Sequence, residues 1–386
     1  MRISKSQNGF TLLELLIASS LGLVVILTMT SLFKMGMDAT FTVTQRAETQ
    51  QNMRAAIELM TKDISLAGGG LPSGGLQLVT GGTVSKIGCN QTGTCYLPAG
   101  TYPNSGGGVI NYMYGIIPGF NAGVENGTAI PAAPGQINSS ITSIYCDYNF
   151  PLSNFTFTFP TTTKTAVAVI NGAVQPNNIL AAGGLLKGDL LLFTVNTPGN
   201  GKTASGTSLV QNAAVVAEIT NIPSSTEIDF TAGDPLNFNQ SGGGIANNLA
   251  TVAADAGGAG AQVSACRLNA VSYFLQVPPA GGTVQTPRLM RQVNGLDAVP
   301  VADNIINLQF TYDVIDSVNG TVVANQQDPI GAGESPGLVQ KVNIWIMGSS
   351  LISGGNRSQS MYLATSVSTR DMSFCNSYSA TATVCQ

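Results

Sequence analysis

Hydrophobic residues dominate the start of the chain before polar residues become frequent. From Phe10 to Phe33, 24 residues contain a single charged side chain, Glu14. As an α-helix this run is about 36 Å long, which exceeds the roughly 30 Å hydrocarbon core of a bilayer. The polar segment before it carries Arg2 and Lys5, which favours a cytoplasmic N-terminus. The pattern therefore predicts a membrane-spanning helix.

The helical pattern continues past the membrane. Between Gln45 and Ala67, apolar residues recur every three or four positions and define one face. This face consists of Met53, Ala56, Ile57, Met60, Ile64 and Ala67. The charges of Arg54 and Asp63 are interpreted as part of a solvated face with local ion pairs. No proline occurs before Pro72, so one helix over residues 10–67 is expected, with residues 10–33 as its membrane half and an amphipathic second half.

Beyond residue 68 the pattern changes to short alternating segments bounded by turn residues, which is typical of β-strands. The clearest strands are predicted at 268–277, 305–312 and 342–346, and Asn294-Gly295 predicts a hairpin turn. Low-complexity stretches near 68–145 and 232–264 are interpreted as long loops, the second as a mobile surface loop. The expected fold class is α+β, with the long helix packed on a mainly antiparallel, β-rich head over residues 68–386.

The junction between the polar leader and the apolar run carries a specific motif. An ordinary secretory signal is cleaved after its apolar region, but here the small residue Gly9 precedes it. Gly9, Phe10 and Glu14 together resemble the class III signal of type IV prepilins and pseudopilins. A plain membrane anchor with a stray glutamate would need all these features to coincide by chance.

This resemblance implies specific roles for the motif residues. A prepilin peptidase would remove residues 1–9 by cutting between Gly9 and Phe10, and Phe10 would become the N-methylated first residue. Glu14 would then be the fifth mature residue and would neutralise the N-terminal amine of a neighbouring subunit. A carboxylate in an apolar bundle needs such a partner, and so does an ammonium group.

Later segments narrow the resemblance. Residues 52–68 (NMRAAIELMTKDISLAG) resemble the corresponding helix of PilW-type minor pilins, and the J-type pseudopilins of type II secretion are similar there. The order of the segments around Tyr273-Phe274, Leu289-Met290 and Asn307–Tyr312 also resembles PilW-type C-terminal regions.

Composition and charge limit the possible partners of the head. Only 9% of the residues are charged, and 45 are glycine, which is typical of exported β-rich proteins. Loss of Arg2 and Lys5 with the leader takes the basic residues from 16 to 14, against 20 acidic ones, a formal charge of −6. Nucleic acid is therefore disfavoured as a partner, because phosphate binding needs a basic face.

The chain has six cysteines: Cys89, Cys95, Cys146, Cys266, Cys375 and Cys385. An exported domain meets an oxidising compartment, so disulfides are expected, although six cysteines allow many connectivities. Proximity favours Cys89–Cys95 and Cys375–Cys385, which leaves Cys146 with Cys266. A metal site is the competing interpretation, and the lack of any CxxC pair and of any histidine disfavours it.

Catalytic chemistry finds no support in the sequence. Without histidine, neither a Ser-His-Asp nor a Cys-His arrangement can form. The glycine runs at 68–70 and 106–108 lack the Lys-Ser/Thr of a phosphate loop. Asp313, Asp316 and Asn319 do not match the EF-hand spacing and are interpreted as a polar hairpin turn. Nothing in the sequence marks a pair of carboxylates for the cleavage of glycosides. We expect no enzymatic activity, no cofactor and no bound metal.

The expected function is therefore that of a minor pilin, a structural subunit that helps to prime pilus assembly and lies at or near the tip. Its partners would be the major pilin, other minor pilins and the prepilin peptidase. It would cross the inner membrane once before assembly, with a periplasmic head, and become extracellular in the pilus. Two alternatives remain: a type II secretion pseudopilin, or a tip adhesin that binds a surface ligand.

Overall fold

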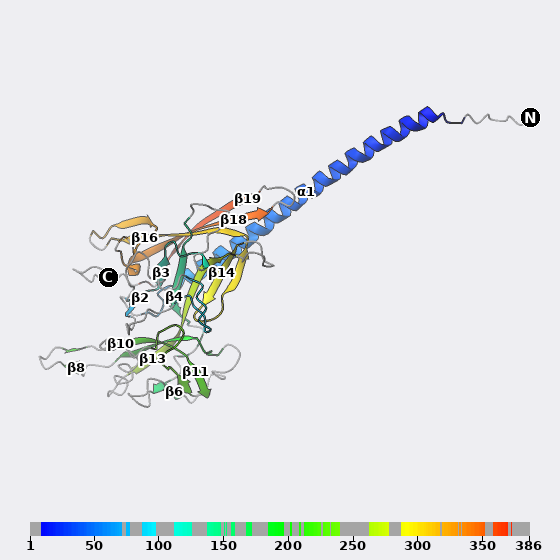
Figure 1. The fold of residues 1–386 in the computed structure, drawn as a ribbon. Coiled ribbons are helices and arrows are strands. Elements are labelled where there is room, and N and C mark those ends of the chain that lie inside the picture. Colours follow the sequence, from blue (N-terminus) through cyan, green and yellow to red (C-terminus); the bar gives the residue numbers. More distant parts are fainter. Residues whose placement is uncertain are drawn as a thin grey trace, which may run out of the picture.

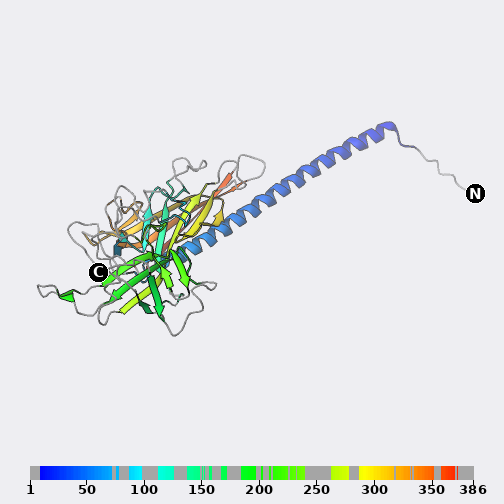
Figure 2. The same cartoon turned by 60° about the horizontal axis from the view of Figure 1, so that its bottom comes forward.

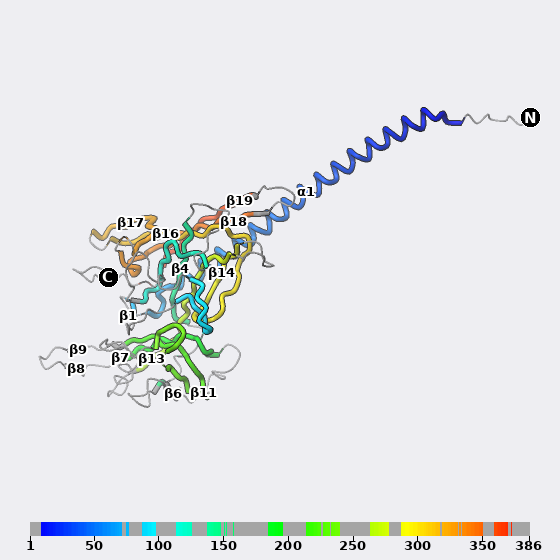
Figure 3. Tube along the Cα trace, in the orientation of Figure 1, coloured from blue at the N-terminus to red at the C-terminus, as the bar shows by residue number. Residues whose placement is uncertain are grey.

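The computed structural model describes most of the helix and the core of the head (Figure 3). The described residues are 9–71, 75–77, 87–97, 112–125, 137–147, 150, 152, 156–158, 167–171, 184–196, 201–202, 208–209, 212–224, 227–231, 233–239, 262–277, 287–316, 319–330, 332, 334–351, 358–369 and 372.

One long helix organises the molecule. Helix α1 covers Leu12–Ser65, 54 residues and about 81 Å, and begins two residues later and ends two residues earlier than the expected range 10–67. Thr11 is its N-cap, with an extended backbone, and Leu66 is its C-cap. Gly68 follows with a φ of 87°, which a glycine adopts without strain.

The first part of α1 projects far from the head, and its last turns are inserted into the head (Figures 1 and 2). The head is built mostly of antiparallel strands in several sheets. The expected fold class, a long helix packed on a mainly antiparallel β-rich head, is confirmed.

The largest sheet has seven strands. Its longest strand pairs with β7 over its first half and with β4 and β14 over its second half, so it links two parts of the head. The strands are β3 (Ile116–Gly119), β4 (Ser140–Cys146), β7 (Leu190–Asn196), β10 (Asn212–Glu218), β13 (Gln262–Gln276), β14 (Arg288–Val293) and β15 (Val299–Asp303).

A second sheet lies along the helix, and we call it the helix-side sheet. Its order is β17-β16-β18-β19, and its strands are β16 (Ile305–Ile315), β17 (Val322–Gln326), β18 (Val339–Leu351) and β19 (Ser358–Ser368). The short 3₁₀ helix η3 (Pro336–Leu338) leads into β18.

Three smaller sheets complete the head. One has the order β11-β12-β6-β5, and the others are the pairs β1-β2 and β8-β9. Their strands are β1 (Leu76–Gln77), β2 (Tyr112–Met113), β5 (Thr156–Thr158), β6 (Val167–Asn171), β8 (Gly201–Lys202), β9 (Ser208–Leu209), β11 (Asn221–Ser224) and β12 (Glu227–Asp229).

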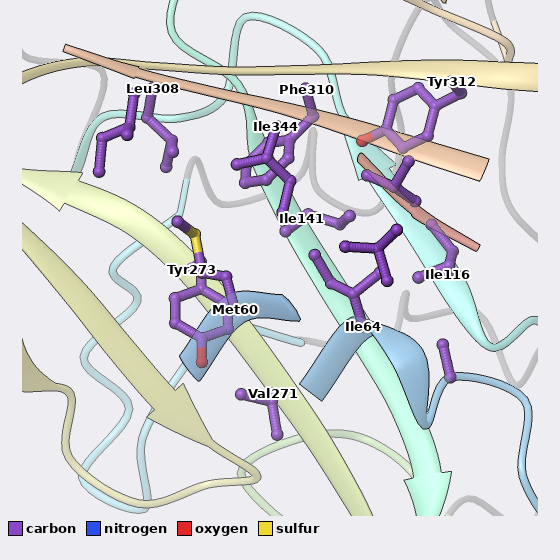
Figure 4. Close-up of a cluster of buried hydrophobic side chains, with 14 of the residues drawn as sticks. Met60, Ile64, Ile116, Ile141, Val271, Tyr273, Leu308, Phe310, Tyr312 and Ile344 are labelled. Carbon is purple, nitrogen blue, oxygen red and sulfur yellow. The ribbon is translucent and has the colours of Figure 1, made fainter. Parts of the chain in front are cut away.

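The apolar face of α1 supplies part of the main core (Figure 4). Met53, Met60 and Ile64 are fully buried against both large sheets. Figure 4 shows Met60 beside Tyr273 of β13, and Ile344 of β18 among the side chains above them. Burial of such side chains stabilises by about 1.5–3 kcal/mol each, so this face fixes the helix to the head.

Two expectations for loops were wrong. Residues 140–145, placed in the loop-rich stretch near 68–145, belong to β4, whose residues are all buried because the strand pairs with β3 and β13. In the expected mobile loop near 232–264, Leu236 and Phe238 are buried in the core, and β13 begins at Gln262. Serine, threonine and asparagine hide the apolar pattern in both places.

Candidate functional site

The tip of α1 carries the motif residues. Thr11 and Glu14 form a capping box, in which the Glu14 Oε2 accepts hydrogen bonds of 3.0 Å from the backbone N–H and from the hydroxyl of Thr11. Phe10 is 88% exposed. Gly9 and Phe10 lie directly before the helix and are exposed; residues 1–8 of the expected leader lie outside the described residues.

The first half of the helix packs against no other part of the chain that the structure describes. Its large apolar side chains are exposed all around, including Leu13, Ile17, Leu27 and Phe33. Within the described residues, α1 is the single helix long and apolar enough to cross a membrane. Water is a poor solvent for this surface, so a bilayer or other apolar helices must cover it.

Four of the six expected cysteines form disulfides in the head. Cys89 pairs with Cys95, and Cys146 at the end of β4 pairs with Cys266 in β13. The first is a pair that proximity favours, and the second is the pair that this pairing leaves over; Cys375 and Cys385 lie outside the described residues. The Cys146–Cys266 bond joins residues 120 apart in sequence, so it restricts the unfolded chain strongly.

A polar cluster inside the main core was missed. Asp63, interpreted from sequence as solvated, is 3% exposed, and its carboxylate accepts hydrogen bonds from Tyr145, Tyr273 and Arg291. The distances are 3.0, 2.6 and 2.8 Å, respectively. The interpretation of Asp63 as a solvated charge was therefore wrong, because its three partners come from distant strands that face the end of α1. Arg54 is exposed, as expected.

The electrostatics of this cluster follow from burial and from Asp63. Burial and the adjacent carboxylate raise the pKa of the Tyr145 and Tyr273 hydroxyls, which therefore stay protonated and donate. Although burial works in the opposite direction, the Asp63 carboxylate raises the pKa of Arg291. A charged and hydrogen-bonded network thus ties α1 to β4, β13 and β14.

A second buried carboxyl group lies in β10. Glu218 of β10 is fully buried, and its Oε2 accepts a hydrogen bond of 2.9 Å from the backbone N–H of Leu236. Gln91, in the loop between Cys89 and Cys95, donates to its other oxygen. Burial, followed by a hydrogen bond with Asp234, raises the pKa of Glu218 to about 8.

Neither acidic cluster has the form of a metal site. Within the described ranges, no group of three or more Asp, Glu and Cys side chains is placed so that it could hold a metal ion. Asp316 and Asn319 close the turn between β16 and β17 through a 2.6 Å side-chain hydrogen bond, so the polar hairpin turn is confirmed for these two residues. Asp313 lies before the turn, in β16, and forms a 2.6 Å ion pair with Lys341 of β18.

Comparison with known proteins identifies one part of the chain. Residues 4–30 match the family model of the prokaryotic N-terminal methylation motif. No curated protein matches the chain, and no solved structure matches it either. The motif and the apolar helix behind it fit a type IV prepilin-like protein, either pilin-like or pseudopilin-like. Such a motif implies processing by a prepilin peptidase, assembly with other pilins and a start in the inner membrane.

Proposed function

We propose that this prepilin-like chain is a PilW-type minor pilin, a non-enzymatic subunit that helps to prime type IV pilus assembly near the tip. The observation that carries the proposal is the contrast along α1: a bare apolar half that bears the methylation motif, followed by a half built into the head. The resemblance of residues 52–68 to PilW-type helices supports the choice among pilin-like proteins.

Glu14 would act through exchange of partners. In the single chain its carboxylate is satisfied locally by Thr11. Among apolar helices of an assembled bundle, the methylated amine at Phe10 of one chain would be a costly isolated charge. Pairing with a neighbour's glutamate removes that cost, and both charges are then compensated. Glu14 thus favours a neighbour placed at one axial offset, which makes it a determinant of register.

The proposal is tested by counting sheared surface pili. We expect a strain without this chain to lose most filaments, and a strain with Glu14→Ala to show a matching defect. Glu48→Ala is the matched control, because Glu48 is exposed on the same helix and outside the membrane half. Normal filament numbers in the deletion strain would contradict the priming role. Assays of the culture medium for secreted proteins, and of surface adhesion, would then test the two alternative functions.

A further inference from the structure

The free edges of the large sheets differ in how well they are protected. Edge strands present unpaired backbone groups, and proteins usually protect them with proline, charge, bulges or short length. Strand β15 has five residues, includes Pro300, and its pairing with β14 contains a register shift. Strand β17 also has five residues, with a register shift against β16 and Asn325 at a φ of 59°. Both edges are therefore poor templates for another strand.

Strand β19 lacks these protections. It is the last strand of the helix-side sheet and pairs with β18 through eleven consecutive residue pairs, from Leu351–Ser358 to Lys341–Ser368, without a shift. Its sequence, SQSMYLATSVS, contains no charged residue and no proline. In the part of the chain that the structure describes, no strand pairs with its other edge. A long, regular, uncharged edge of this kind can accept an added strand.

An exposed aromatic pair lies on the same strand. Tyr362 is 70% exposed, more than any other exposed large apolar residue described in the head. Its ring stacks on that of Trp345 in β18, with 6.3 Å between the centroids. Tyrosine and tryptophan are the residues that most often dominate protein–protein interfaces. The pair therefore offers an anchor for the side chains of a strand added beside it.

The helix fixes which partner can reach this edge. Thr49 and Met53 lie against Gly348, which pairs with Met361 near the start of β19. Gly68 and Met372 both lie against Gly115, so the end of α1 and the end of β19 also meet at one place. The final turns of α1 therefore run alongside β19 in the same direction, and the membrane half leaves the head at the start of this strand (Figures 1 and 2).

This direction argues against an antiparallel pair of copies. Two β19 edges paired antiparallel about a two-fold axis would send their two α1 helices in opposite directions. Helices that share one membrane or one bundle must run the same way. In another arrangement, β19 would pair in parallel with the opposite edge of the helix-side sheet of another copy. That edge is β17, which is short and irregular. A different chain with its own regular edge meets both conditions.

We propose that the free edge of β19 accepts an edge strand from a different pilin-like subunit in the same assembly, with Tyr362 and Trp345 as its anchor. The inference rests on the proposed function, because assembly through α1 is what brings a second head to this edge. The β19 contact pairs the backbones of two heads, in addition to the contact between their helices. This edge of the head would then determine which subunit is the neighbour.

The test uses the full chain in piliated cells. A photo-crosslinking residue is placed at Ser366 on β19, or at Val322 on β17 as the matched control, because both positions are exposed on edge strands of the same sheet. Each of the other minor pilins of the same pilus carries an epitope tag in turn. We expect one of them to crosslink from Ser366 and not from Val322. Tyr362→Lys should reduce this crosslink at least tenfold, whereas Val322→Lys should leave it unchanged.

The outcomes separate this inference from the proposed function. A crosslink of the chain to its own second copy, or no crosslink to any tagged pilin while Glu14→Ala still abolishes pili, would overturn the inference and leave the proposed function in place. Normal piliation in the deletion strain and in Glu14→Ala would refute the function itself. Thermal unfolding of Tyr362→Lys in detergent should match the wild type; if that variant unfolds early, Ala364→Lys, at an exposed position of β19 paired with Trp345, replaces it with the same expectation.

Discussion

The two halves of α1 belong to one continuous helix but have opposite environments. Met60 is completely buried between the sheets, whereas Met29 is 68% exposed although both are methionines on the same helix. The second half finds its apolar partners inside the chain, so it stabilises the head. The first half finds none, so its partners must be lipid or other subunits. The second half of the helix therefore serves the folding of the head, and the first half is available for assembly.

The two acidic residues near the ends of the helix show the same separation. Asp63 is satisfied by three donors from three strands of the head. Glu14 is satisfied by its own N-cap, which leaves it free to change partners. A carboxylate held by the fold cannot serve assembly without damage to the fold. A carboxylate that is held only by a helix cap can change partners without such damage.

The largest expected effect on stability comes from Asp63→Ala. This change leaves Arg291 without its partner and removes the acceptor of two buried hydroxyls, so we expect a loss of about 3–5 kcal/mol. Glu58→Ala on the exposed side of the same half should change stability by less than about 0.5 kcal/mol. Denaturant unfolding of the full chain in detergent measures both, and equal effects would refute the role of the cluster.

A smaller effect is expected from paired methionine changes, which compare the two halves directly. Met60→Ala removes a fully buried side chain and should destabilise the head by about 2–5 kcal/mol. Met29→Ala removes an exposed one and should leave the unfolding of the isolated chain unchanged. The same unfolding assay applies. A large loss with Met29→Ala would show that the first half does pack on the head.

The smallest expected effect is a change in the stability of the head with pH. It depends on Glu218 in β10 and leaves the helix unaltered. The pKa of Glu218 in the folded chain is about 8, above its usual value of 4.5. The stability from its protonated form is therefore complete below pH 4.5 and is lost as the pH rises toward 8.

Glu218→Gln cannot ionise, so we expect it to flatten the fall in Tm of the full chain between these two pH values. Pilus numbers should stay normal, since Glu218 is remote from the tip of α1. An unchanged pH profile would show that Glu218 ionises normally in the fold.

Sequence patterns predicted what depends on near neighbours in the chain. The buried face of α1, with Met53, Met60 and Ile64, follows from three- and four-residue spacing, and the strand face of Val342, Ile344 and Ile346 follows from alternation. Asp63 was misjudged because its donors lie 82, 210 and 228 residues away, and no local pattern contains them.

The same limit explains the missed strand. The seven residues of β4 are Ser, Ile, Thr, Ser, Ile, Tyr and Cys, too polar to suggest a buried strand. The hydroxyl of Thr142 lies 2.6 Å from that of Ser272 across the sheet, and the hydroxyl of Tyr145 donates to Asp63 of α1. The motif at Gly9, Phe10 and Glu14 was readable because it is contiguous, although the partners it serves belong to other chains.

The parallel course of α1 and β19 has a mechanical consequence. A pull on the head, resisted at the far end of the helix, would act along the helix axis and therefore along the contact from Met53 to Gly68. Such a load shears many buried contacts at once instead of peeling them one after another. With no proline between residues 10 and 67 to bend it, the helix would act as a tether that transmits tension to the main core of the head.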